Sequence, residues 1–325
     1  MIISRTPLRI SLGGGGTDLP SYYRSSGEGF LVAAGITKYV YVAVHDNFAD
    51  RYLLKYSRVE DVKSIDEINH PLIRAALEYL DVAPGIEITS VADIPAGTGL
   101  GSSGTFAVGL IKALHGYRRQ YVGNHEIAAQ ACHLEIDVLS EPVGKQDQFI
   151  AAVGGVTAFR FRDDETVDIQ SVVVPPYARH VIEDGLTLFY TGTRRSASDE
   201  LHALNGGSAG SDSFMKNNLD QVRDAGHRAF RALQDGDVEG LGGMLTDQWK
   251  LKLARSPSPI HKLVDDWITA GCEAGALGGK LVGAGGGGFL LFLTLDKARL
   301  RARMKEIGLR EVAIGIDYQG TTIGV

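Results

Sequence analysis

One glycine-rich stretch runs directly into an apolar segment with helical spacing: Pro95-Ala96-Gly97-Thr98-Gly99-Leu100-Gly101-Ser102-Ser103-Gly104-Thr105-Phe106, followed by residues 107–114. Glycines leave the backbone amides uncovered and permit positive φ. A helix N-terminus adds unpaired N–H groups and a partial positive charge. The hydroxyls of Ser102 and Ser103 can bind phosphate oxygens or a metal ion. The stretch therefore predicts a loop that binds the triphosphate of a nucleotide.

Two other nucleotide motifs fit this stretch less well. Gly99, Gly101 and Gly104 match the dinucleotide pattern G-x-G-x-x-G, which needs a strand running straight into the glycines and an acidic residue about 20 positions later. Here residues 93–96 separate the expected strand from the loop, and Glu126 lies in a helical pattern. The P-loop pattern is absent because no lysine follows these glycines. A tight turn without a ligand explains one or two glycines, but poorly explains four glycines and two serines that lead into a helix.

Charge and hydropathy narrow the class of protein. A formal net charge of −6 argues against a nucleic-acid binder, which usually carries a basic stripe. No stretch approaches the roughly 20 apolar residues of a membrane span. Arg5 and Arg9 interrupt the first apolar run, which argues against a signal peptide. Cys132 and Cys272 are expected to be reduced thiols of a cytoplasmic protein. The sequence leaves the oligomeric state open, a homo-oligomer included.

Periodicity along the chain indicates an α+β fold with mostly antiparallel sheets covered by helices. Expected strands cover residues 1–11, 30–34, 37–45, 52–56, 86–91, 156–161, 167–174, 186–191, 279–282, 289–293 and 312–318. Expected helices cover residues 70–80, 106–114, 124–139, 196–204, 214–233, 238–253, 259–270 and 297–307. The pair Pro175-Pro176 marks a break. We therefore expect two domains, residues 1–176 and 177–325.

Three glycine clusters stand in order along the chain, and together they resemble the motifs of the GHMP kinase superfamily. They are Pro7-Leu8-Arg9-Ile10-Ser11-Leu12-Gly13-Gly14-Gly15-Gly16-Thr17-Asp18, the stretch from Pro95 to Phe106, and Lys280-Leu281-Val282-Gly283-Ala284-Gly285-Gly286-Gly287-Gly288-Phe289. The resemblance implies a two-domain fold with an N-terminal domain like ribosomal protein S5 domain 2 and an active site in the interdomain cleft. It also implies an ATP-binding loop. The expected nucleotide contacts are Pro95, Gly97, Gly99, Leu100, Gly101, Ser102, Ser103 and Gly104.

The resemblance also implies roles for single residues. Asp147 matches the catalytic aspartate of galactokinase and mevalonate kinase, and Arg9 matches a basic residue near the transferred phosphoryl group. Glu135 matches a helix glutamate that binds Mg²⁺ together with Ser103. From its position alone, Glu135 could equally be a surface residue at the edge of an apolar stripe. Asp18 matches an aspartate that binds sugar hydroxyls. Further expected substrate contacts are Gly15, Thr17 and Gly286.

The expected substrate follows from the resemblance of single segments to particular kinases within the superfamily. Galactokinases carry Gly-Glu-His before the aspartate of the first motif, whereas this chain has glycines there. The segments Glu141–Gln148 and Tyr190–Ala197 resemble the D-glycero-D-manno-heptose 7-phosphate kinases, with fucokinases as the alternative. The resemblance implies phosphorylation of the anomeric hydroxyl of a sugar phosphate, on a route to nucleotide-activated heptose and surface polysaccharide.

Binding of a sugar phosphate needs a positive pocket. Arg194, Arg195 and Lys145 are its candidates, although each could be a solvated surface charge. A non-catalytic ligand-binding protein of the same fold is a further alternative. The joint presence of Arg9, Asp147 and the magnesium ligands argues against it, since a pure binder does not need an aspartate at the transfer position.

Overall fold

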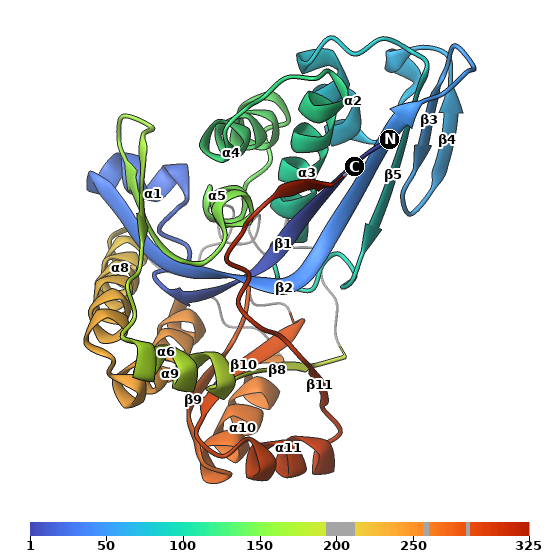
Figure 1. Cartoon of the computed structure of the whole chain (residues 1–325). Helices are drawn as coiled ribbons and strands as arrows, with labels where there is room; N and C mark the ends of the chain where they lie inside the picture. Colours follow the sequence, from blue (N-terminus) through green and yellow to red (C-terminus); the bar gives the residue numbers. More distant parts are fainter. Residues whose placement is uncertain (193–211, 256–259, 284–286, 325) are drawn as a thin grey trace.

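The computed structural model describes residues 1–192, 212–255, 260–283 and 287–324. Within them the chain forms two sheets, one of eight strands and one of four. Figure 1 shows the larger sheet built around two long, bent strands, β1 and β2, and the smaller sheet below the bend in these strands. The strand pairs are antiparallel apart from β3 with β5, so the predicted α+β arrangement is confirmed.

The long strand β2 (Glu28–Asp46) is the centre of the larger sheet. It pairs with β1 (Ile2–Gly13) along most of its length, and with β5 (Ile86–Ala92) and β6 (Val156–Arg162) on its other edge. The sequence predicted two strands here, with a break after residue 34. β2 instead continues as one strand. Its register with β1 shifts beside Pro7, where a β-bulge accommodates a proline that has no N–H to donate.

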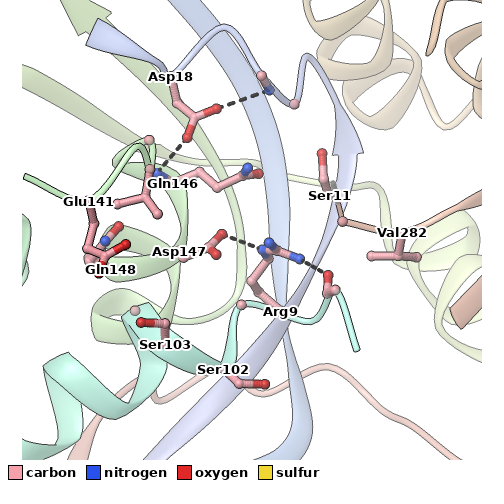
Figure 2. A pocket seen from close by; sticks show the side chains of 18 of the residues that line it. Arg9, Ser11, Asp18, Ser102, Ser103, Glu141, Gln146, Asp147, Gln148 and Val282 are labelled. Carbon is pink, nitrogen blue, oxygen red and sulfur yellow. Dashed lines mark hydrogen bonds and ion pairs between the residues drawn. The ribbon is translucent and has the colours of Figure 1, made fainter. Parts of the chain in front are cut away.

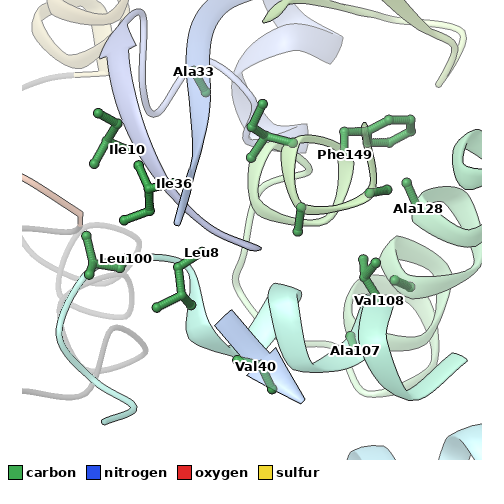
Figure 3. Close-up of a cluster of buried hydrophobic side chains, with 14 of the residues drawn as sticks. Leu8, Ile10, Ala33, Ile36, Val40, Leu100, Ala107, Val108, Ala128 and Phe149 are labelled. Atoms are coloured by element: carbon green, nitrogen blue, oxygen red, sulfur yellow. The ribbon is translucent and has the colours of Figure 1, made fainter. Parts of the chain in front are cut away.

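Helices cover this sheet and bury one continuous apolar core. On one face, α3 (Ser102–Tyr117) packs against β1 and β2, and α5 (Gln146–Val153) packs beside it. Figure 3 shows side chains from these elements meeting, including Leu8, Val108 and Phe149. The helix α8 (Asp212–Asp235) contacts the end of β1 and the start of β2. There the rings of Phe30 and His227 stack with their centroids 3.9 Å apart.

The smaller sheet has the order β11-β8-β10-β9. Its strands are β8 (Leu186–Tyr190), β9 (Ala276–Leu281), β10 (Phe289–Thr294) and β11 (Arg310–Val312). Its helices are α6 (Pro176–Gly185), α9 (Val238–Arg255), α10 (Ile260–Glu273) and α11 (Lys297–Glu306). The chain then returns to the larger sheet, where β12 (Thr322–Gly324) pairs with β1. The boundary after residue 176 stays a prediction.

Several predictions about local structure need correction. The strand predicted over 312–318 is only three residues long and is followed by a single bridge between Ile316 and Ile36. The helix predicted over 124–139 is α4 (Asn124–Cys132) followed by a π-helical turn, η2 (His133–Val138). The helix predicted over 196–204 lies outside the described residues.

The remaining elements are short. They are α1 (Pro20–Ser26), β3 (Tyr52–Lys55), β4 (Val59–Val62), η1 (Ile65–Glu67), α2 (Pro71–Tyr79) and β7 (Val167–Ser171). None of the helices in the described ranges is long and apolar enough to cross a membrane.

Candidate active site

A cavity of about 1120 Å³ opens where the glycine-rich motifs meet. Both sheets contribute to its wall, β1 through Arg9 and Ser11 and β9 through Lys280. The helices α3, α5, α8 and α9 supply further residues. Figure 2 shows side chains from the first motif, the glycine-rich loop and α5 facing one another across this space. Described residues of all three motifs, which are far apart in the sequence, thus line one cavity.

The glycine-rich loop has the backbone expected of a phosphate-binding loop. Gly97, Gly99 and Gly101 all have positive φ, at 76°, 82° and 78°. The helix α3 begins at Ser102, four residues earlier than predicted, with Gly101 as its N-cap. Its first amides therefore lack helical partners and can donate to an anion. Of the eight expected nucleotide contacts, Pro95 and Leu100 do not line the cavity. The other six do, namely Gly97, Gly99, Gly101, Ser102, Ser103 and Gly104.

The third motif packs directly against this loop. A Cβ atom on Gly99 would lie 2.7 Å from the carbonyl oxygen of Val282, and one on Gly288 would lie 2.0 Å from that of Thr98. Only glycines permit the two backbones to approach this closely. The described part of the third motif therefore holds the loop in place, and Gly286 lies outside the described residues.

Arg9 joins the first motif to the loop and to α5. Its Nε donates to Asp147 Oδ1 at 2.6 Å, and its Nη1 donates to the carbonyl oxygen of Gly99 at 2.6 Å (Figure 2). Arg9 is buried, whereas the side chain of Asp147 is partly open to the cavity. Asp147 lies in the first turn of α5, where the helix dipole favours a negative charge. Its carboxylate is thus fixed beside the glycine-rich loop.

Glu135 is buried in the wall of the cavity, with 2% of its surface exposed, so it is not the surface residue that its position alone allowed. Its Oε1 accepts from Ser103 Oγ at 2.5 Å, and its Oε2 accepts from Gln148 Nε2 at 2.6 Å. Burial raises the pKa of Glu135 to about 7, although these two hydrogen bonds oppose the rise. Glu135 belongs to η2, and such π-helical turns are frequent at functional sites.

The oxygen atoms around Glu135 fit a magnesium ion. Ser102 Oγ and Gln148 Oε1 are buried without a hydrogen-bond partner, and both residues line the cavity beside Ser103 and Glu135. Mg²⁺ prefers hard oxygen ligands and usually takes only one or two carboxylates, keeping waters and phosphate oxygens for the rest. In the described residues no cluster of three or more His, Cys, Asp or Glu could hold a metal by itself. A metal at this position would take its remaining ligands from water or from the oxygens of a bound phosphate.

A second polar group surrounds Asp18. Its Oδ1 accepts from the backbone N–H of Gly16 at 3.0 Å, and its Oδ2 accepts from the backbone N–H of Gln146 at 3.1 Å (Figure 2). Burial, and then the charge of Asp147, raise the pKa of Asp18. Ser11 Oγ and Gln146 Oε1 are buried nearby without partners. Together they offer donors and acceptors for hydroxyl groups close to Asp147.

Two expected substrate contacts lie outside the cavity wall. Thr17 is fully buried, and its hydroxyl donates to the carbonyl oxygens of Gly14 and Phe30, so it holds the first-motif loop in place. Lys145 pairs with Glu165 at 2.7 Å. Gly15 does line the cavity, whereas Arg194 and Arg195 lie outside the described residues.

One polar and three basic residues that the sequence reasoning missed also line the cavity. Gln248, Lys252 and Arg255 of α9 line it at spacings of four and three, which place them on one face of the helix. Lys280 of β9 is buried and donates to Gln248 Oε1 at 3.1 Å. Burial, and then the charges of Lys252 and Arg9, lower the pKa of Lys280 to about 7. The helical spacing of polar residues in α9 was a signal in the sequence that could have been used.

Comparison with known proteins agrees with this geometry. The family model for the GHMP kinase N-terminal domain matches residues 70–155, and the model for the GHMP kinase C-terminal region matches residues 229–308. The D-glycero-alpha-D-manno-heptose 7-phosphate kinase of Campylobacter jejuni is 26% identical over 100% of this chain and 98% of its own length. A bifunctional fucokinase/GDP-fucose pyrophosphorylase of Arabidopsis thaliana is 26% identical over 92% of this chain, which spans 31% of that protein.

Solved structures share the fold. A D-glycero-D-manno-heptose 1-phosphate kinase from Bacteroides thetaiotaomicron has a TM-score of 0.79 and 21% identity, covering 100% of this chain and 99% of that one. Lactococcus lactis galactokinase in complex with galactose has a TM-score of 0.73 and 17% identity, covering 99% and 95%. The predicted two-domain fold is thereby confirmed. Two family models in the expected order, a relative that aligns from end to end and this shared fold show that the chain belongs to the GHMP kinase family.

Proposed function

We propose that this GHMP kinase transfers the γ-phosphoryl group of ATP to the anomeric C1 hydroxyl of D-glycero-D-manno-heptose 7-phosphate, giving the 1,7-bisphosphate. The relatives support an ATP-dependent sugar kinase. The heptose substrate rests on the end-to-end alignment with a heptose 7-phosphate kinase. The observation that carries the chemistry is the position of Asp147, which Arg9 holds between the phosphate-binding loop and the polar group around Asp18.

In this proposal the loop amides and the N-terminus of α3 bind the phosphates of ATP. The acceptor oxygen attacks the γ-phosphorus, the bond from that phosphorus to the bridging oxygen breaks, and ADP leaves. Asp147 orients the attacking hydroxyl and accepts its proton. Arg9 contacts Asp147 with Nε and can stabilise the negative charge of the transferred group with its other donors. Catalysis thus consists of positioning and charge neutralisation.

The proposal includes a magnesium ion held by Glu135 and Ser103, with Ser102 beside them. When bound, Mg²⁺ neutralises part of the charge on the phosphates. Glu135 must be ionised to serve as a ligand, so binding of the metal competes with the proton that burial favours. Ser103 Oγ, which donates its proton to Glu135 Oε1, would keep its lone pairs available as a ligand.

The acceptor lies against the first motif in this proposal. Asp18, Ser11 and Gln146 provide oxygen and nitrogen atoms for the sugar hydroxyls, and Gly15 leaves the space between Ser11 and Gln146 free. The second candidate is L-fucokinase or another kinase of a free sugar. It is favoured by the fucokinase relatives, whose identities of 26% and 27% are similar to that of the heptose kinase.

An ADP-release assay over a panel of acceptors separates the two candidates. The panel contains heptose 7-phosphate, free heptose, L-fucose, galactose and mevalonate, each with ATP and Mg²⁺. We expect the highest kcat/KM with heptose 7-phosphate, and ³¹P NMR of the product should show a new anomeric phosphate. A higher kcat/KM with L-fucose would establish the second candidate instead. Asp147→Asn serves as the control for contaminating kinases.

A further inference from the structure

Arg255 is a buried arginine in the wall of the cavity, and none of the described residues forms an ion pair with it. It lies at the end of α9, and only 9% of its surface is exposed. Its guanidinium makes one hydrogen bond, a long one of 3.5 Å from Nη1 to Asn218 Oδ1. No carboxylate in the described part of the chain lies within ion-pair distance of it. Burial lowers the pKa of Arg255 to about 10. An arginine has five N–H donors, so among the described residues most of the donors of Arg255 have no acceptor and remain available to a ligand in the cavity.

Such an arrangement is costly unless an anion completes it. A buried charge without a partner loses its hydration and gains no compensating interaction. The cost falls away when a ligand brings a negative charge into the cavity. A phosphate group suits a guanidinium especially well, because two parallel N–H donors match two phosphate oxygens.

The position of Arg255 separates it from the ATP-binding loop. A Cβ atom on Gly16 would lie 3.5 Å from Arg255 Nη2 and 3.7 Å from Nη1, so the end of the guanidinium lies against the first motif. Asp18, two residues further on, interacts electrostatically both with Arg255 and with Asp147. Asp18 therefore lies near both Asp147 and Arg255, and all three residues line the same cavity. An acceptor whose hydroxyl lies at Asp147 and whose hydroxyls contact Asp18 can thus bring its far end toward Arg255.

We propose that Arg255 binds the phosphate at the far end of the sugar acceptor, while the anomeric hydroxyl lies at Asp147. This inference rests on the proposed function and adds the residue that selects a sugar phosphate over a free sugar. Asn218 positions Arg255, since its Nδ2 donates to the Leu251 carbonyl at 2.9 Å and fixes Oδ1 toward the guanidinium. Lys145, the earlier candidate within the described residues, is instead engaged by Glu165.

The test compares Arg255→Gln with Lys250→Gln, which removes the same charge from an exposed position on the same helix. KM and kcat are measured with heptose 7-phosphate and with free heptose, and KM is measured for ATP. We expect Arg255→Gln to raise KM for heptose 7-phosphate about 100-fold, the loss of two hydrogen bonds to a charged group. KM for free heptose and for ATP should change less than about 3-fold, and Lys250→Gln should behave as wild type.

The outcomes separate this inference from the proposed function. If wild type prefers heptose 7-phosphate and Arg255→Gln keeps that preference, Arg255 is not the phosphate site, although the proposed function stands. If wild type does not prefer the phosphorylated sugar, the proposed acceptor and the role of Arg255 are both wrong. Arg255→Lys keeps the charge but loses the paired donors, so it tests the site even if Arg255→Gln does not fold. We expect a loss of about 10-fold for it, confined to the phosphorylated acceptor.

Discussion

Replacing Glu135 by glutamine should make the ligand-free protein more stable at alkaline pH. Burial raises the pKa of Glu135 from 4.5 to about 7, so the folded state holds this proton more tightly than the unfolded state does. The corresponding stability is fully present below pH 4.5 and is lost as the pH rises through 7. The whole loss is about 3 kcal/mol, and about 2 kcal/mol of it falls between pH 5.5 and pH 8.

Glutamine at position 135 cannot titrate, and the surroundings can accept it. Gln148 Oε1 is buried without a partner, so a rotated Gln148 amide could accept from the new NH₂ group. We therefore expect the free energy of unfolding of Glu135→Gln, relative to wild type, to be about 2 kcal/mol more favourable at pH 8 than at pH 5.5. The comparison between two pH values cancels any constant effect of the substitution on packing.

Urea unfolding measures this difference without nucleotide or metal. Trp249 is 1% exposed, so its fluorescence should change when the chain unfolds. Glu126→Gln, an exposed position on α4, controls for the change of side chain and should follow wild type. Stability curves of Glu135→Gln and wild type that run parallel between pH 5.5 and pH 8 would refute the reasoning. With ATP present, the same variant should need more Mg²⁺ for half-maximal rate, because a carboxylate ligand is lost.

Three further predictions concern the transfer site. Asp147→Asn should lower kcat by about 10²–10⁴-fold while ATP still binds, as measured by calorimetry; near-normal turnover would remove Asp147 from the mechanism. Gly144→Ala should raise the acceptor KM more than the ATP KM, because its Cβ would lie 1.9 Å from Asp18 Oδ2, whereas Gly123→Ala, which has open space, should be neutral. Lys280 should take up a proton when ATP binds near pH 8, because its pKa of about 7 rises beside an anion. Calorimetry in buffers of different ionisation enthalpy should detect this uptake in a Glu135→Gln background, and Lys280→Met should abolish it.

The sequence predicted the site best where glycine dictates the backbone. The positive φ values of Gly97, Gly99 and Gly101 follow from local chemistry, and so does the helix that they precede. The start of that helix was placed four residues late, because Ser102 and Ser103 are weak helix formers whose role at a helix start depends on the loop before them. Periodicity located most strands, but it divided β2 at Gly35, where pairing with β1 on both sides of the glycine keeps the strand intact.

Tertiary contacts decided what local patterns could not. The ion pair between Arg9 and Asp147, in the first turn of α5, joins residues 138 positions apart. Only the resemblance to a family indicated that these two residues act together. Arg255 lies far along the chain from the first motif, and its helical spacing with Gln248 and Lys252 gives them a shared helix face but not the burial of that face against the first motif. The burial of Lys145 against Tyr23 and its ion pair with Glu165 likewise depend on the folded arrangement.

The pairing of β12 with β1 has a consequence for synthesis of the protein. The hydroxyls of Thr6 and Thr321 meet at 2.8 Å although 315 residues separate them. A ribosome releases β1 long before β12, so the edge of β1 at Ile3–Arg5 stays unpaired in the interval. Contacts between such distant segments also form slowly. The nascent chain therefore exposes an unpaired strand edge to neighbouring chains until β12 has been made, and this edge is where a chaperone would protect it.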